Sequence, residues 1–85
     1  MTQSNYTVAK SVDCKGLACP MPVVRAKKEI RGLGNGDILE ILATDPGSVK
    51  DIPAWANRVG HEFLETVDED GLFRHYVKKS QKEEA

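Results

Sequence analysis

Hydrophobic positions along the chain of 85 residues change their spacing from one segment to the next. In Val8–Cys14 three of the four alternate residues are apolar, namely Val8, Val12 and Cys14 with Lys10 between them, which predicts a first strand. Apolar residues at helical spacing then predict a helix that ends near Arg31, before a glycine-rich turn. The face of this helix consists of Val23, Ala26, Ile30 and Leu33. The first part of the chain is therefore expected to form a strand followed by a helix.

The middle of the chain predicts a second strand and a second helix. Apolar residues nearly fill Asp37–Thr44, which is typical of a central strand covered on at least one face. The helix that follows has an apolar face made of Ile52, Trp55, Ala56 and Val59. A proline is tolerated in the first turn of a helix, so Pro53 predicts a start with Asp51 as the N-cap. Gly60 is expected to end this helix.

Two further strands are predicted over His61–Asp68 and Leu72–Lys79, joined by a hairpin with the turn signal Asp70-Gly71. The order is strand, helix, strand, helix, strand, strand. Right-handed helical crossovers join parallel strands and place both helices on one face, whereas a short turn joins antiparallel strands. We expect an α/β two-layer sandwich with the order βαβαββ, a four-stranded mixed sheet and two helices on one face. Residues 1–85 should form a single domain whose ends, about 1–7 and 80–85, are flexible.

Composition narrows the classes of function. Hydrophobic residues make up 40% of the chain and charged residues 29%, as in a folded domain, and the net charge is −1. Aromatic residues make up only 6%, so we expect no direct binding of nucleic acid. The chain lacks a run of 18 apolar residues and a signal-peptide core, so we expect a cytoplasmic protein that does not bind membranes.

Charge is unevenly distributed along the chain. Residues 10–31 carry six basic and two acidic side chains, whereas residues 37–70 carry nine acidic and two basic ones. Such an asymmetry steers a protein partner in some proteins and is only a solvated surface in others. The sequence leaves both interpretations open.

The stretch Gly16-Leu17-Ala18-Cys19-Pro20-Met21-Pro22 contains the residues best suited to chemistry. If Pro20 is the first helical residue, Cys19 is the N-cap. A cysteine at a helix N-terminus has a lowered pKa, because the positive end of the helix dipole favours the thiolate. The alternative is that Cys19 is a small buried hydrophobic residue and the prolines merely begin a helix.

Other residues of this stretch are expected to support the cap. Gly16 allows a sharp turn, and Pro22, like the preceding proline, lacks an N–H group. The N–H groups of Met21 and Val23 are then the main donors left for the cysteine sulfur or an anionic atom attached to it. A rigid cap of this kind would hold the sulfur outward.

Cys14 is a possible second thiol. It could resolve an oxidised Cys19 through a disulfide or relay sulfur, but a strand residue with no chemical role is the alternative that we favour. The spacing of the two cysteines differs from the Cys-x-x-Cys of dithiol oxidoreductases. Two cysteines, with His61 and His75 far along the chain, do not indicate a zinc site, and we expect neither a metal nor a cofactor.

These residues resemble the TusA/SirA family of small sulfur-carrier proteins, whose mark is Gly-Leu-x-Cys-Pro-x-Pro after a first strand. The resemblance covers nearly the whole chain. Further matching segments are Asp45-Pro46, Asp51-Ile52-Pro53 with Trp55, Gly60-His61 and Val77-Lys78-Lys79. The resemblance implies that Cys19 accepts sulfane sulfur as a persulfide and passes it to a partner protein. In the family this relay serves tRNA thiolation, molybdenum-cofactor synthesis or sulfur oxidation.

We therefore expect a sulfur carrier with Cys19 as its catalytic residue and little turnover alone. The implied partners are a cysteine desulfurase or rhodanese-type donor and a thiol protein as acceptor. Thiol–persulfide exchange needs a nucleophile and access to it, which a small domain can offer. Two alternatives remain open: a thiol redox switch that uses Cys14 and Cys19, and a regulatory binding module without catalysis.

Overall fold

A computed structural model describes residues 7–80 of the chain. The strands are β1 (Val8–Cys14), β2 (Ile38–Ala43), β3 (Glu62–Glu69) and β4 (Leu72–Lys78), and the helices are α1 (Met21–Ile30) and α2 (Ser48–Val59). The expected order βαβαββ is confirmed, and most boundaries differ from the predicted ones by one residue. The ends predicted to be flexible lie outside the described residues except for Thr7 and Ser80.

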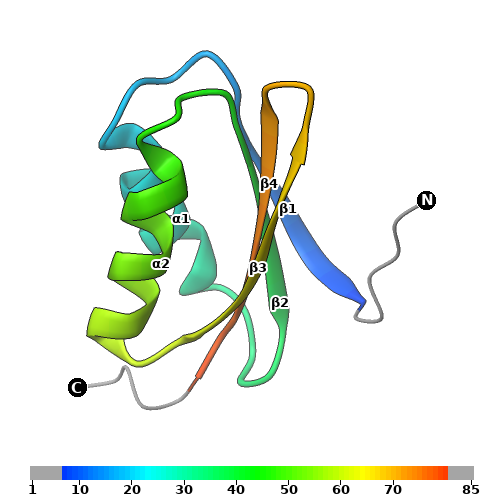
Figure 1. The fold of residues 1–85 in the computed structure, drawn as a ribbon. Coiled ribbons are helices and arrows are strands. Elements are labelled where there is room, and N and C mark those ends of the chain that lie inside the picture. Colours follow the sequence, from blue (N-terminus) through cyan, green and yellow to red (C-terminus); the bar gives the residue numbers. More distant parts are fainter. Residues whose placement is uncertain (1–6, 81–85) are drawn as a thin grey trace.

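The sheet is mixed, as predicted, with the strand order β1-β2-β4-β3. Strand β1 pairs in parallel with β2, while β4 pairs antiparallel with both β2 and β3. Both helices lie on the same face of this sheet (Figure 1). The hairpin between β3 and β4 turns at Asp70 and Gly71, which both have positive φ, as a two-residue type I′ turn requires.

The hydrophobic core fills the space between the helices and the sheet. Its buried members are Val12, Cys14, Ala26, Ile30, Leu39, Ile41, Ile52, Trp55, Ala56 and Val77. The predicted apolar faces of both helices therefore point inward. Burial of a large aliphatic side chain such as Leu39 or Ile41 contributes about 1.5–3 kcal/mol to the stability of the fold. Trp55 on the apolar face of α2 is only 2% exposed.

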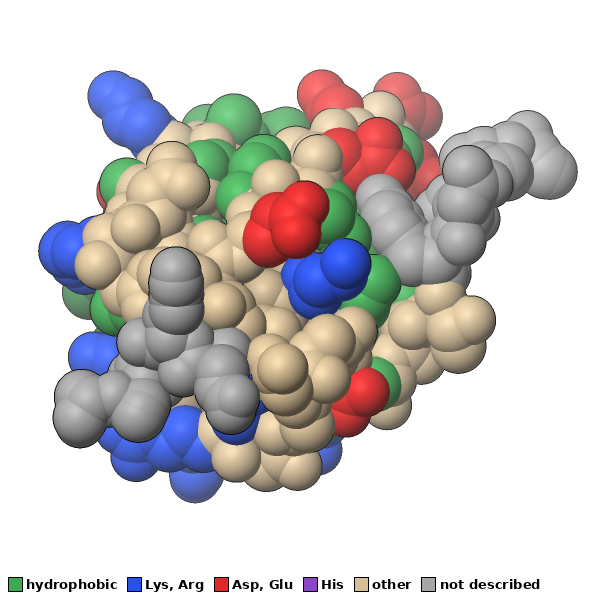
Figure 2. All heavy atoms as spheres, turned by 90° about the horizontal axis from the view of Figure 1, so that it is seen from below, with side chains coloured by type: hydrophobic (Ala, Val, Ile, Leu, Met, Phe, Trp, Pro, Cys, Tyr) green, Lys and Arg blue, Asp and Glu red, His purple; other side chains and the backbone are tan. Residues whose placement is uncertain are grey.

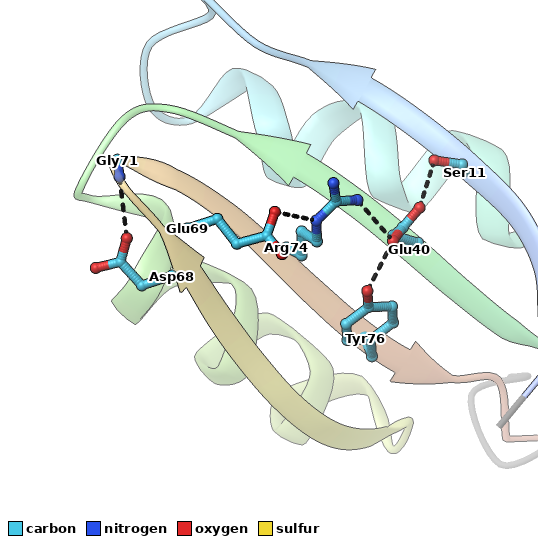
Figure 3. Close-up of polar contacts among 7 residues, drawn as sticks. All are labelled: Ser11, Glu40, Asp68, Glu69, Gly71, Arg74 and Tyr76. Carbon is cyan, nitrogen blue, oxygen red and sulfur yellow. Dashed lines mark hydrogen bonds and ion pairs between the residues drawn. The ribbon is translucent and has the colours of Figure 1, made fainter. Parts of the chain in front are cut away.

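The open face of the sheet carries a polar network that crosses all four strands (Figure 3). Glu40 accepts hydrogen bonds from the hydroxyls of Ser11 at 2.8 Å and Tyr76 at 2.7 Å. Arg74 pairs with Glu40 at 3.3 Å and with Glu69 at 2.9 Å. Burial alone would raise the pKa of Glu40, but these hydrogen bonds and the Arg74 charge outweigh it and lower that pKa. The network thus stabilises a carboxylate on the face that the helices leave uncovered.

Helix α2 begins earlier than the sequence predicted. Its first residue is Ser48 and its N-cap is Gly47, so Asp51 lies inside the helix rather than at the cap. Pro53 is consequently in the helix interior and not in the first turn. The N–H groups of residues 48 and 49 bond to Asp45 and Pro46 carbonyl oxygens, which extends the helical turn into the preceding loop. Gly60, with φ 93°, ends the helix as expected.

A buried histidine connects α2 to the two strands of the hairpin. His75 on β4 is 0% exposed, and its ring nitrogens lie 2.8 Å from Ser48 Oγ and 2.8 Å from Thr66 Oγ1. Burial lowers its pKa to about 4, so the ring is neutral at pH 7. A neutral ring donates through one nitrogen and accepts through the other, which both hydroxyls can match. His75 on the sheet therefore fixes Ser48, the first residue of α2, through a hydrogen bond.

Charged side chains occupy separate parts of the surface. Exposed basic residues on α1 and the turn after it are Lys27, Lys28 and Arg31, and exposed acidic residues on β3 are Glu62, Glu65, Asp68 and Glu69. Seen from below, the end opposite the β1–α1 loop shows Lys and Arg along one edge and Asp and Glu mainly along the other (Figure 2). Within residues 7–80, none of the helices is long and apolar enough to cross a membrane.

Candidate active site at Cys19

The site lies where the loop before α1 meets the loop before α2. Two backbone groups of the first loop donate to side chains of the second: Gly16 N to Thr44 Oγ1 at 3.0 Å, and Cys19 N to Asp45 Oδ2 at 3.1 Å. Both loops follow neighbouring parallel strands, so the topology brings their starts to the same edge of the sheet. Gly16 has φ 81°, which confirms that this position needs a glycine-type turn.

The sequence predicted Cys19 as the N-cap of α1, and the structure contradicts this prediction. The helix begins at Met21 and its N-cap is Pro20, which makes no capping hydrogen bond with its side chain. The two donors expected to face the sulfur are also used elsewhere. Met21 N bonds to Ala18 O at 2.9 Å, and Val23 N bonds to Pro20 O at 3.0 Å. The N-terminus of α1 therefore stabilises a thiolate at Cys19 less than the predicted N-cap position would.

The thiol of Cys19 instead contacts an acidic side chain. Its Sγ donates a hydrogen bond to Asp51 Oδ2 at 2.7 Å. This bond, together with Asp45, raises the pKa of Cys19 to about 12, because two nearby carboxylates disfavour a thiolate. The expectation of a lowered pKa was wrong: carboxylates contributed by the other loop and helix outweigh the helix dipole.

Gly47 lies close against the sulfur. A Cβ added at residue 47 would stand 2.8 Å from Cys19 Sγ and 3.0 Å from Asp45 Oδ2. Only glycine leaves room for both groups. Asp45, Gly47 and Asp51 were not predicted to be site residues. Asp51 was predicted as a helix cap and Asp45 only as part of a segment shared with the family, and no local pattern indicates that these residues meet Cys19.

Beside the cysteine is an open hollow of about 200 Å³ between the start of α1 and α2. It is lined by Pro20, Val23, Asp51, Ala54, Trp55 and Arg58. Pro20 follows Cys19 directly, and Asp51 accepts a hydrogen bond from the Cys19 thiol, so the hollow adjoins Cys19. Pro22, by contrast, is fully buried and belongs to the base of α1. The hollow is too small and open to enclose a large cofactor.

The other candidate residues, Cys14 and His61, are buried. Cys14 is 0% exposed and packs in the core, where burial raises its pKa. Both cysteines are free thiols. His61 is buried against Trp55, with ring centroids 5.5 Å apart, and accepts a hydrogen bond from Ser80 N at 3.1 Å. Over residues 7–80, no group of three or more His, Cys, Asp or Glu side chains could hold a metal ion.

Comparisons with known proteins identify the family. Residues 10–79 match the family model described as sulfurtransferase TusA. The sulfur carrier protein TusA of Allochromatium vinosum is 45% identical over 71 residues, which cover 84% of this chain and 93% of that protein. A longer Bacillus subtilis protein, YrkF, is 52% identical over 68 residues, and the match spans 37% of its length.

A solved structure agrees with the fold. The crystal structure of a SirA-like protein from Desulfitobacterium hafniense matches with a TM-score of 0.75 and 27% identity. The match covers 85% of this chain and 99% of that one. Sequence and structure together show that this chain belongs to the sulfurtransferase TusA family.

Proposed function

We propose that Cys19 is the residue on which this sulfur carrier of the TusA family holds sulfur as a persulfide. The observation that carries the proposal is the contrast between the two thiols. Cys19 is half-buried and adjoins Pro20 and Asp51, which line the hollow, whereas Cys14 is 0% exposed in the core. A reagent or partner can therefore approach Cys19 without opening the fold.

The reaction is an exchange between a thiol and a persulfide. The Cys19 sulfur attacks the outer sulfur of a donor persulfide, R–S–SH, and displaces the donor sulfur. The products are Cys19–S–SH and R–SH, so one S–S bond forms and one breaks, and no external oxidant is needed. Delivery repeats the step with an acceptor thiol in the role of the attacking group.

The partners that suit this chemistry are proteins. We propose a cysteine desulfurase or a rhodanese-type protein as donor and a thiol protein as acceptor, all within the reducing cytoplasm. Exposed apolar side chains near the site support protein docking. Met21 begins α1 and is 40% exposed, while Val49 lies in the first turn of α2 and is 41% exposed. Residues 1–85 would act as a single domain in this relay.

Mass spectrometry after incubation with a sulfane-sulfur donor tests the proposal. Trypsin separates the two cysteines, since cleavage at Lys15 and Arg25 places Cys19 in residues 16–25 and Cys14 in residues 11–15. Gain of one sulfur atom on the Cys19 peptide supports the carrier. Loss of two hydrogen atoms with cross-linked peptides would instead support a redox switch, and no change at either thiol would support a binding module.

A further inference from the structure

The hydrogen bond between Cys19 and Asp51 has a consequence for the reactivity of the carrier. The distance of 2.7 Å is short for a thiol donor, and the acceptor is a carboxylate. Asp45 places a second carboxylate beside the same residue through its bond to the Cys19 backbone N–H. Among the described residues, neither aspartate forms an ion pair. The described residues thus place two carboxylates beside Cys19 without a cation paired to either.

We propose that Asp51 is a positioning residue that holds the unloaded Cys19 as a neutral thiol and so limits its exchange with small molecules. This inference deepens the proposed function and rests on it. It concerns the empty carrier, which must meet its proper donor in a cell that also contains low-molecular-weight electrophiles and persulfides. A protonated thiol is a poor nucleophile toward all of them, because the thiolate is the attacking form.

Loading with sulfur must break this contact. In Cys19–S–SH the Sγ atom is bonded to carbon and to the outer sulfur, so it has no hydrogen left to donate. The outer sulfur extends about 2 Å beyond Sγ, the length of an S–S bond. The hydrogen bond from Sγ to Asp51 therefore exists in the empty carrier only, and the proton that left Cys19 ends on the thiol of the displaced donor.

Asp51, rather than Asp45, carries this role for a geometric reason. Asp51 accepts from the sulfur itself, whereas Asp45 accepts from the backbone of the same residue. Gly47 leaves space for the sulfur, since its missing side chain lets Sγ lie against the turn before α2. Arg58, which lines the same hollow, lies two helical turns beyond Asp51. The sulfur thus faces carboxylates on the side of the second loop and α2.

Alkylation of the reduced protein by iodoacetamide tests the inference without any sulfur donor. The rate at Cys19 is followed on its tryptic peptide from pH 7 to pH 10 in wild type, Asp51→Asn and Asp51→Ala. In wild type we expect the rate to rise about tenfold per pH unit across the range. In both variants we expect a rate at pH 8 that is about tenfold higher, and a plateau that begins at lower pH. The expected gain is smaller than the gain in thiolate, because nucleophilicity falls with pKa.

Asp70→Asn provides the matched control. It removes the same charge at an exposed hairpin position with φ 56°, a conformation that asparagine tolerates well. We expect its Cys19 profile to equal that of wild type. If Asp51→Asn and Asp51→Ala fold, as thermal melting will show, and their profiles equal wild type, the inference is wrong. An equal shift in Asp70→Asn would also overturn it, since net charge would then be the cause.

Glutathione persulfide separates this inference from the proposed function. We expect Asp51→Asn to gain sulfur at Cys19 faster than wild type does. If the variant alkylates faster but neither protein takes up sulfur at Cys19, the carrier function is wrong and the role of Asp51 stands. If both take up sulfur equally and their alkylation profiles are the same, the function stands and the role of Asp51 is wrong.

Discussion

Gly47 and Cys19 are in direct contact across two loops, and the missing side chain of Gly47 leaves the space that the sulfur occupies. A Cβ at residue 47 would stand 2.8 Å from Sγ, a distance that real Cβ atoms essentially never show. The neighbouring carboxylate of Asp45, 3.0 Å from the same point, blocks the obvious direction of relief. The loop before α2 therefore shapes the site as much as the Cys-Pro-Met-Pro segment does.

Gly47→Ala should displace the Cys19 sulfur and weaken the fold. We expect a loss of about 1–3 kcal/mol, as for other overpacked sites, and a change in the alkylation rate of Cys19. Thermal melting and tryptic mapping of the alkylated protein measure both effects. Gly32→Ala is the control, because its nearest neighbour, Glu29 O, is 3.7 Å away and its φ is ordinary. Equal melting temperatures for wild type and Gly47→Ala would contradict the contact.

Cys19→Ser should fold normally but carry no sulfur. The serine hydroxyl can still donate to Asp51, so the main polar contact of the side chain is retained. We expect a melting temperature within a few degrees of wild type and no sulfur adduct by mass spectrometry. A Cys19→Ser protein that gained sulfur at Cys14 would move the active role to Cys14.

Cys14 should be silent in the native state. Its side chain is 0% exposed within the core, and burial raises its pKa, so both access and ionisation oppose reaction. We expect alkylation at neutral pH to modify Cys19 before Cys14, and Cys14 to react only once denaturant unfolds the protein. The ratio of alkylated tryptic peptides, with and without guanidinium chloride, measures this. Faster modification of Cys14 in the folded protein would show that β1 opens readily.

Acid should destabilise the protein through His75. Its pKa is lowered to about 4 from 6.5, so the unfolded chain binds a proton that the folded chain rejects. The stability that depends on neutral His75 is therefore complete above about pH 6.5 and is lost as the pH falls toward 4. The shift corresponds to a loss of about 3 kcal/mol at most. Urea unfolding at pH 7.5, 5.5 and 4.5 measures it.

The variant His75→Gln isolates this contribution. Glutamine keeps a donor and an acceptor for Ser48 and Thr66 but does not titrate in this range. We expect a less stable protein at pH 7.5 whose stability changes less between pH 7.5 and 4.5. If the decline with acid is the same in both proteins, carboxylates such as Glu40, whose pKa is also lowered, account for it instead.

Most of the fold could be predicted because local patterns and topology agree. The alternation in β1, the helical spacing of Ala26 and Ile30, and the turn at Asp70-Gly71 each indicate one conformation. The handedness of helical crossovers then leaves one face for both helices. The start of α2 was missed because Asp51 and Pro53 both suit a helix start. Ser48 is instead held in helical conformation by the loop before it and by buried His75.

The amino-acid sequence was sufficient to mark Cys19 as the candidate sulfur-carrying thiol and to identify the family to which the chain belongs. It could not determine the protonation of that thiol. The residues next to Cys19 in the chain begin a helix, and a helix N-terminus favours a thiolate. The residues that decide the matter, Asp45 and Asp51, lie 26 and 32 positions further along. Only the packing of the two loops brings their carboxylates to the sulfur, and at 2.7 Å a carboxylate outweighs a helix dipole whose N–H groups are already bonded.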